Sequence, residues 1–246
     1  MSDLALLALT RLNIVVASAT ALFAFSLAVY LFVYNVRDAV ARAFVFLLAF
    51  VTVVYVGDVF LATARLSPSH PASTFWLRFE WLGIAFVVPA YLHFGHALLA
   101  TTGDRSARRA AGIIAAYALG GATLVGVLVG DAIVDGAVGV PGAVRLRPGP
   151  LFPAFALGFA GVTAWAAWCV WRARARTLTH RSHRRMTYLL VSVFAPLSTF
   201  PYLLAGAAPL AANPALFQSL AAVANVAIAT MLVFVTWAVA YHGALT

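Results

Sequence analysis

Residues 43–64 read AFVFLLAFVTVVYVGDVFLATA, and Asp58 is the one charged residue among them. A helix rises about 1.5 Å per residue, so about 20 apolar residues suffice to cross the hydrocarbon core of a bilayer, which is about 30 Å thick. The stretch therefore predicts a membrane-spanning helix. The carboxyl group of Asp58 is unusual in such a helix, because a charge inside the membrane is costly.

Apolar stretches of similar length recur along the whole chain and leave no room between them for a soluble domain. There are seven, at about residues 12–34, 40–64, 75–101, 110–130, 150–173, 186–207 and 215–241. We therefore expect an all-α integral membrane protein in which residues 1–246 form a single domain, a bundle of seven transmembrane helices.

The amino-acid composition agrees with a membrane protein and excludes some classes of function. Charged residues make up 9% of the 246 residues, against about 25% in soluble domains. All 16 basic residues are arginines, and with the 7 acidic residues they give a net charge of +9. Most lie in short loops, where arginine sets topology and contacts lipid headgroups, so no nucleic-acid partner is expected. The absence of lysine excludes a retinal protein, whose chromophore needs a lysine Schiff base.

The arginines also predict the orientation of the bundle. Eleven lie in the links after the first, third and fifth spans, namely Arg37, Arg42, Arg105, Arg108, Arg109, Arg172, Arg174, Arg176, Arg181, Arg184 and Arg185. Five lie on the other side, namely Arg11, Arg65, Arg78, Arg145 and Arg147. Because basic short loops stay in the cytoplasm, we expect the N-terminus outside and the C-terminus in the cytoplasm. The longest outer loop, at about residues 131–149, is long enough for a small lid.

Three ionisable residues fall at one depth near the outer end of the second and third spans. Asp58 and Glu80 each lie about 9 Å below the outer surface, and Arg78 lies close by. An unpaired charge there is costly, so we expect these groups to pair with one another. At 100° per residue, Arg78 and Glu80 point to different neighbours, and only one of them can meet Asp58 well.

A candidate ligand site follows from the polar residues expected to face the bundle interior. It combines Asp58, Arg78 and Glu80 with four uncharged side chains, those of Tyr55, Tyr202, Gln218 and Asn225. Hydrogen bonds between helices that serve packing alone are the competing interpretation.

Prolines and histidines within the spans suggest hinges and a metal alternative. Pro89, Pro196 and Pro201 each remove a helical hydrogen bond, so they are candidate hinges. His93 and His96 lie towards the inner end of the third span. They are the only candidates for a metal or haem site there, and no acidic residue is near to complete a ligand set. We therefore expect no metal and no cofactor.

Span three carries a resemblance to a known family. Residues 75–94 read FWLRFEWLGIAFVVPAYLHF, with Arg78, Glu80, Gly83 and Pro89 in a distinctive order. This stretch resembles the third helix of the N-terminal seven-transmembrane sensor region of bacterial and archaeal histidine kinases and related signalling proteins. The span count, the orientation and the short loops are similar as well.

The resemblance implies a sensory or receptor module, part of a two-component system, in the inner or plasma membrane of a cell. Such a module passes an extracytoplasmic or membrane signal to a cytoplasmic output domain or protein. Its expected partners are the lipid bilayer, that output, a small ligand and a second copy of the chain in a homodimer. No catalytic residue is expected here, because the short loops hold no nucleotide-binding domain. Catalysis would belong to a further C-terminal domain or to a separate partner.

Two alternatives of other classes stay open. One is a proton- or cation-coupled transport protein that uses Asp58 and Glu80. The other is a membrane oxidoreductase with histidine-ligated metal or haem, built on the histidine pairs His93/His96 and His180/His183.

Overall fold

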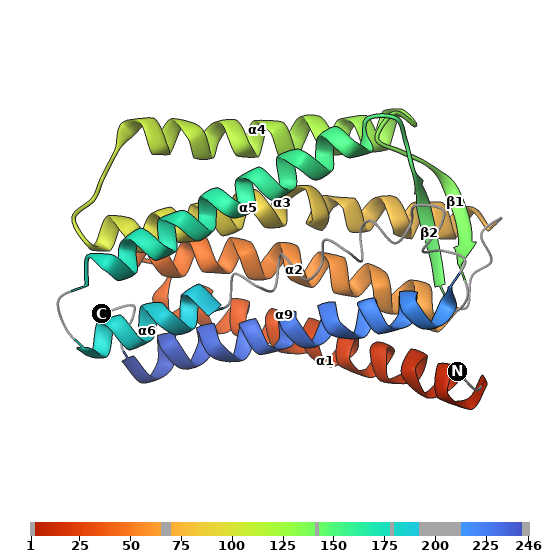
Figure 1. Ribbon diagram of the computed structural model, residues 1–246, viewed down its shortest axis with the longest axis horizontal. Coiled ribbons are helices and arrows are strands. Elements are labelled where there is room, and N and C mark those ends of the chain that lie inside the picture. Colours follow the sequence, from red (N-terminus) through yellow and green to blue (C-terminus); the bar gives the residue numbers. More distant parts are fainter. Residues whose placement is uncertain (1–2, 65–69, 141–142, 178–179, 192–212, 243–246) are drawn as a thin grey trace.

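Long apolar helices dominate the computed structural model of the chain (Figure 1), which describes residues 3–64, 70–140, 143–177, 180–191 and 213–242. Six of the described helices are long and apolar enough to cross a membrane. The chain is therefore a multi-pass membrane protein with an α-helical membrane domain. The six helices are α1 (Asp3–Asn35), α2 (Ala39–Ala64), α3 (Pro71–Thr101), α4 (Ala107–Val129), α5 (Phe152–Ala175) and α9 (Pro214–His242).

The helix ends follow local chemistry. Asp38 accepts a hydrogen bond from the backbone N–H of Ala41 (2.8 Å) and so caps the start of α2. At the start of α3, the His70 side chain accepts from the Ala72 N–H (3.2 Å), and Pro71 occupies the first helical position. Such signals are local, so the observed bounds of α2, α4, α5 and α9 lie within three residues of the predicted ones.

Three predicted spans differ more from the structure. Helix α3 begins at Pro71, four residues before the predicted start at residue 75. Helix α1 begins at Asp3, nine residues before the predicted span, because residues 4–11 continue the helix. Helix α6 (His180–Val191) contains the start of the predicted sixth span, 186–207. Residues 192–207, with the predicted hinges Pro196 and Pro201, lie outside the described residues.

The outer loop predicted at 131–149 contains regular structure that the all-α prediction did not include. Strands β1 (Val134–Val140) and β2 (Ala143–Pro148) pair antiparallel, with Val138 opposite Arg145 and Asp135 opposite Arg147. Val134 and Leu146 are buried against a small apolar cluster with Leu61, Trp81 and Phe152. The hairpin is therefore packed onto the ends of the helices.

Helix α3 lies at the centre of the bundle. It packs against α2, α4 and α5, while α1 packs against α2 and α9. About two thirds (67%) of the most apolar stretch of α3 is buried inside the protein, against 22–33% for the other five long helices. In Figure 1 the hairpin and the chain's start lie at one end of the bundle, which we call the hairpin end. The opposite end, with the α3–α4 and α5–α6 links, we call the arginine-rich end.

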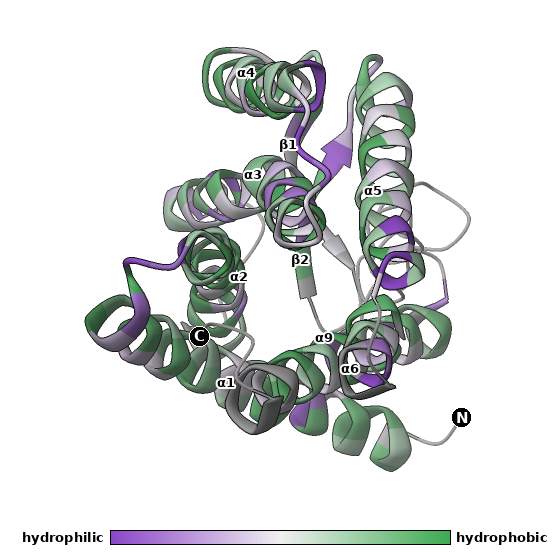
Figure 2. Cartoon of the chain, turned by 90° about the vertical axis from the view of Figure 1, so that its left-hand side faces the viewer, coloured by the Kyte–Doolittle hydropathy of each residue, from purple (hydrophilic) through white to green (hydrophobic). Residues whose placement is uncertain are grey.

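The outer surface of the helices is apolar. Leu22, Ile114, Leu157 and Val129 are 69%, 70%, 75% and 84% exposed, respectively. Figure 2 shows the same pattern, with hydrophobic colours along the long helices and hydrophilic ones mainly in the connections. Exposure of these apolar side chains is unfavourable in water and favourable in the hydrocarbon core of a membrane.

Helices α2 and α3 approach each other closely at Gly83. A Cβ atom at this position would overlap Val54 and lie 2.5 Å from the carbonyl oxygen of Phe50, which belongs to the α2 backbone. Backbone cannot move aside as a flexible side chain can. Glycine is therefore required for the contact between these two helices.

We predict that Gly83→Ala lowers the free energy of unfolding by about 1–3 kcal/mol, the usual cost of overpacking a tight contact. Unfolding by sodium dodecyl sulfate in mixed micelles, followed by helical circular dichroism, measures this difference.

Gly121→Ala is the matched control, because a Cβ atom there meets nothing within 4 Å. It should be neutral or slightly stabilising, since alanine has the higher helix propensity. Equal stabilities of the two variants would contradict the close contact between α2 and α3.

Candidate functional site

The buried charges at the hairpin end are organised by Arg145 of strand β2. Its Nη2 lies 3.1 Å from Oδ1 of Asp58 on α2, and its Nη1 lies 3.5 Å from Oε2 of Glu80 on α3. One guanidinium group thus joins two transmembrane helices to the hairpin. We call these three residues the Arg145 cluster.

Glu80 is the most deeply buried member of the cluster, with 2% of the residue exposed. It lies against Gly57 of α2, where a Cβ atom would overlap the Glu80 side chain. Its second carboxyl oxygen, Oε1, is buried and has no hydrogen-bond partner among the described residues. The site therefore holds an acceptor that a cation, a proton or a ligand N–H could use.

The cluster also reaches α9. The Arg145 guanidinium lies over the ring of Phe217, 5.9 Å from its centroid, and Phe217 is buried. An arginine over an aromatic face is attracted to it. The next residue, Gln218, is bound to α1, because Asn13 donates to its side-chain oxygen (2.9 Å) and to its carbonyl oxygen (3.0 Å).

Arg78 lies outside this cluster, which corrects the predicted mutual pairing of Asp58, Arg78 and Glu80. It binds Asp131 (3.1 Å) and donates to the carbonyl oxygen of Leu128 (2.9 Å), at the end of α4. The predicted difference in direction between Arg78 and Glu80 is confirmed. The pairing was wrong because the cation that meets Asp58 comes from the hairpin, far along the sequence.

The other predicted ligand residues are spread around the cluster. Tyr55 is buried one turn before Asp58 on α2. Asn225 is half-buried on α9, seven residues and about 10 Å beyond Gln218. Tyr202 lies outside the described residues.

The remaining sequence candidates lie on α3. Pro89 is inside the helix, which continues through it from Pro71 to Thr101. His93 Nδ1 lies 3.5 Å from the Tyr117 hydroxyl of α4, and Nε2 of His96 is buried. In the part of the chain that the structure describes, no three His, Cys, Asp or Glu side chains gather as a metal site would require.

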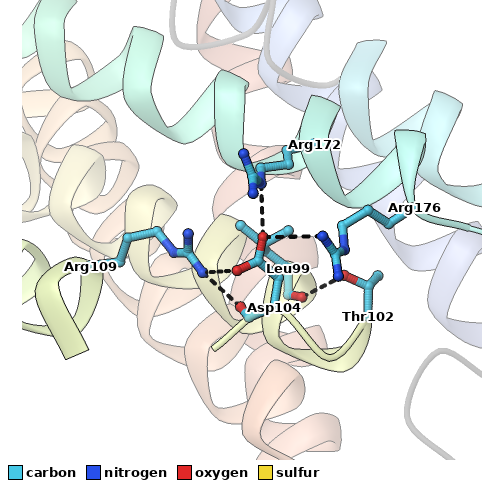
Figure 3. Close-up of polar contacts among 6 residues, drawn as sticks. All are labelled: Leu99, Thr102, Asp104, Arg109, Arg172 and Arg176. Carbon is cyan, nitrogen blue, oxygen red and sulfur yellow. Dashed lines mark hydrogen bonds and ion pairs between the residues drawn. The ribbon is translucent and has the colours of Figure 1, made fainter. Parts of the chain in front are cut away.

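A second ionic cluster, which the sequence did not suggest, lies at the arginine-rich end. Asp104, in the link between α3 and α4, is bound by Arg109 of α4, by Arg172 (2.8 Å) and by Arg176 (3.7 Å). Figure 3 shows the guanidinium groups of Arg109, Arg172 and Arg176 converging on this carboxylate from three directions. Hydrogen bonds from Arg109 and Arg172 lower the pKa of Asp104 below its ordinary value of 3.8. The cluster fastens the end of α5 to the end of α3.

No protein-family model and no curated protein matches the chain.

Arg145→Gln is predicted to lower the free energy of unfolding by about 3 kcal/mol, because it leaves two carboxyl groups facing each other. This loss of stability is at the lower end of the range for removing one partner of a buried ion pair. We expect the lower end because Arg145 and Asp58 are about a fifth exposed (20% and 22%). Adding Glu80→Gln should restore part of the loss. Unfolding in mixed micelles measures both variants.

Arg147→Gln serves as the control, since Arg147 is exposed on the same strand. It should change stability by less than about 0.5 kcal/mol. If Arg145→Gln were as mild as this control, the ion pairs of Arg145 would not hold the helices together.

Asp104→Asn is predicted to lower the melting temperature at pH 7 and to matter less in acid. The pKa of Asp104 is lower in the folded protein, so its stabilising effect is complete above its ordinary pKa of 3.8. The effect is lost as the pH falls through the lower folded value. The difference in melting temperature between wild type and Asp104→Asn should therefore disappear below that pH. Melting curves in detergent from pH 7 downward measure this difference.

Arg105→Gln changes an exposed charge next to Asp104 without touching the cluster. It should keep the pH dependence of the wild type. A gap between wild type and Asp104→Asn that stays constant in acid would show that these ion pairs do not stabilise the fold.

Proposed function

We propose that this protein is a membrane-embedded sensory module that passes a signal from the hairpin end to the arginine-rich end. In this proposal the chain crosses the membrane seven times. Its N-terminus and hairpin lie outside the cell, and its arginine-rich end lies in the cytoplasm. The distribution of the arginines supports the orientation. The resemblance of residues 75–94 to sensor regions of histidine kinases supports the class.

The observation that carries the proposal is that one buried helix is held by arginines at both ends. Helix α3 has 31 residues and is about 46 Å long. Near its start, Glu80 faces Arg145 of the hairpin. Just beyond its end, Asp104 binds Arg172 and Arg176 of α5. A shift or rotation of α3 at one end therefore changes the ion pairs at the other.

The Arg145 cluster suits the input role because its pairing can be exchanged. A ligand that brings its own cation or N–H donors competes with Arg145 for Asp58 and Glu80. Release of Arg145 would break the ion pairs of the hairpin with α2 and α3 at once. Binding energy spent on this exchange would then bias the position of α3, as a two-state sensor requires.

The arginine-rich end suits the output role. Exposed arginines gather in its links and helix ends, namely Arg37, Arg42, Arg105, Arg108, Arg176 and Arg184. Such a surface attracts acidic protein partners and anionic lipids. We propose that a cytoplasmic output domain or protein, such as a kinase, docks on this face.

Cation or proton transport is the second candidate. The buried Oε1 of Glu80, without a hydrogen-bond partner among the described residues, is the observation that favours it. Proton flux into liposomes that is lost in Asp58→Asn would establish transport and would count against a pure sensor.

The sensor proposal predicts that a change at the hairpin moves the opposite end. Spin labels on Arg105→Cys and Ala175→Cys, both exposed, span the α3–α4 link and the end of α5. The buried Cys169 is replaced by alanine. Arg145→Gln should shift the distance between the labels by about 1–2 Å, the size of helix shifts in such transitions. Pulsed electron resonance in liposomes measures this distance.

Arg147→Gln in the same labelled protein should leave the distance unchanged. Circular dichroism first confirms that both variants are folded. An unchanged distance in folded Arg145→Gln would contradict transmission through α3.

A further inference from the structure

A lateral pocket lies between α4 and α5, on the side of α3 away from the Arg145 cluster. Its volume is about 290 Å³, close to the lower end of the range for small-molecule sites. α4 and α5 lie apart on one side of α3 (Figures 1 and 2). Apart from Thr123, its lining side chains are apolar.

The floor of the pocket is the turn of α3 around Pro89. Proline has no N–H, so the carbonyl oxygen of Ala85 lacks the helical hydrogen bond that residue 89 would otherwise donate. Gly120 of α4 packs onto this carbonyl, and a Cβ atom there would lie 2.7 Å from the oxygen. This contact fixes α4 against α3 and leaves the space beside it open towards α5.

Contacts flank the pocket at both ends, and its rim between them is exposed. At the arginine-rich end, the ring of Trp165 on α5 lies against Gly112 on α4. At the hairpin end, the backbone N–H of Leu151 donates to the carbonyl oxygen of Ala132 (2.8 Å). The rim residues Leu119 and Leu151 are each 55% exposed. The opening therefore faces the surroundings of the helices, which at this depth are lipid.

The length of the pocket indicates what kind of molecule can fill it. Its lining on α5 runs from Leu151 to Val162, a distance of about 16 Å along the helix. One leaflet of the hydrocarbon core is about 15 Å thick, half of the full core. A transmembrane helix of a second copy would need twice that length, whereas one acyl chain fits it.

We infer that this pocket is a binding site for a single acyl chain of a membrane lipid from the leaflet at the hairpin end. A void would cost its lining atoms their contacts, and hydrocarbon from the bilayer restores them. Walls on three sides hold such a chain longer than the open surface of a helix can. Binding of this lipid does not depend on whether the protein is a sensor.

Gly158 provides the test, because it lines the pocket and has room for a side chain. A Cβ atom there meets only Leu119, at 3.9 Å, so Gly158→Leu fills the space without disturbing backbone. Gly161→Leu is the matched control on the same helix. It is exposed, lies outside the pocket lining, and a Cβ atom there meets nothing within 4 Å.

The probe is phosphatidylcholine with a photoreactive diazirine on one acyl chain, mixed into liposomes with the full chain. Wild type and Gly161→Leu should be labelled on residues 116–123 and 154–162, with saturation at one lipid per chain. Gly158→Leu should lose labelling there about tenfold, the factor that corresponds to about 1.4 kcal/mol of lost packing. Mass spectrometry of the peptides locates and counts the labels.

Even labelling over the outer faces of α1 and α9, or labelling unaffected by Gly158→Leu, would overturn the inference. So would a cross-link from the pocket to a second copy of the chain. If Gly158→Leu does not fold, the site can still be tested on the wild-type protein alone. Native mass spectrometry after detergent exchange should find one retained lipid per chain, and a lipid-free wild type would refute the site.

Discussion

A carboxylate on the most buried helix of a membrane protein is stabilised by a cation that pairs with it, and here the cation comes from outside the helices. Glu80 is 2% exposed on α3, and an uncompensated charge buried there would be costly. Arg145 reaches it from the hairpin and binds Asp58 of α2 with the same guanidinium. This pairing joins the hairpin to α2 and α3 and places the guanidinium group over Phe217 of α9.

Close packing around α3 makes the pairing geometry definite. Gly57 gives the Glu80 side chain its space, and Gly83 lets the α2 backbone approach. On the other side, Gly120 of α4 packs onto the carbonyl of Ala85. Small residues are the usual means of bringing helices together in lipid, because no hydrophobic force between them is available there. These close contacts fix the positions of the helices that present Asp58 and Glu80 to Arg145.

The two ionic clusters differ in what surrounds them. The Arg145 cluster places one cation between two acids, one of them buried, so it has acceptor capacity to spare. The Asp104 cluster places one acid among three arginines, two of them about half exposed (42% and 45%). The first can therefore accept a cationic or hydrogen-bond-donating group, and the second can offer positive charge to an acidic partner. This asymmetry, together with α3 between them, is the physical basis for proposing a direction of signalling.

The sequence by itself determined the membrane character and the bounds of most helices. Both depend on local properties, the length of an apolar run and the caps at its ends, as Asp38 and Pro71 illustrate. It also indicated that Asp58 and Glu80 are unusual and that Arg78 and Glu80 point apart. The hairpin was missed, although Arg145 and Arg147 alternate with apolar residues as a half-buried strand would. Only the tertiary structure decided which cation meets Glu80, because residue 145 reaches residue 80 through the docking of the hairpin. The lipid-facing pocket was likewise decided there, since it depends on how far α4 and α5 diverge across α3, and no periodicity within one helix encodes that distance.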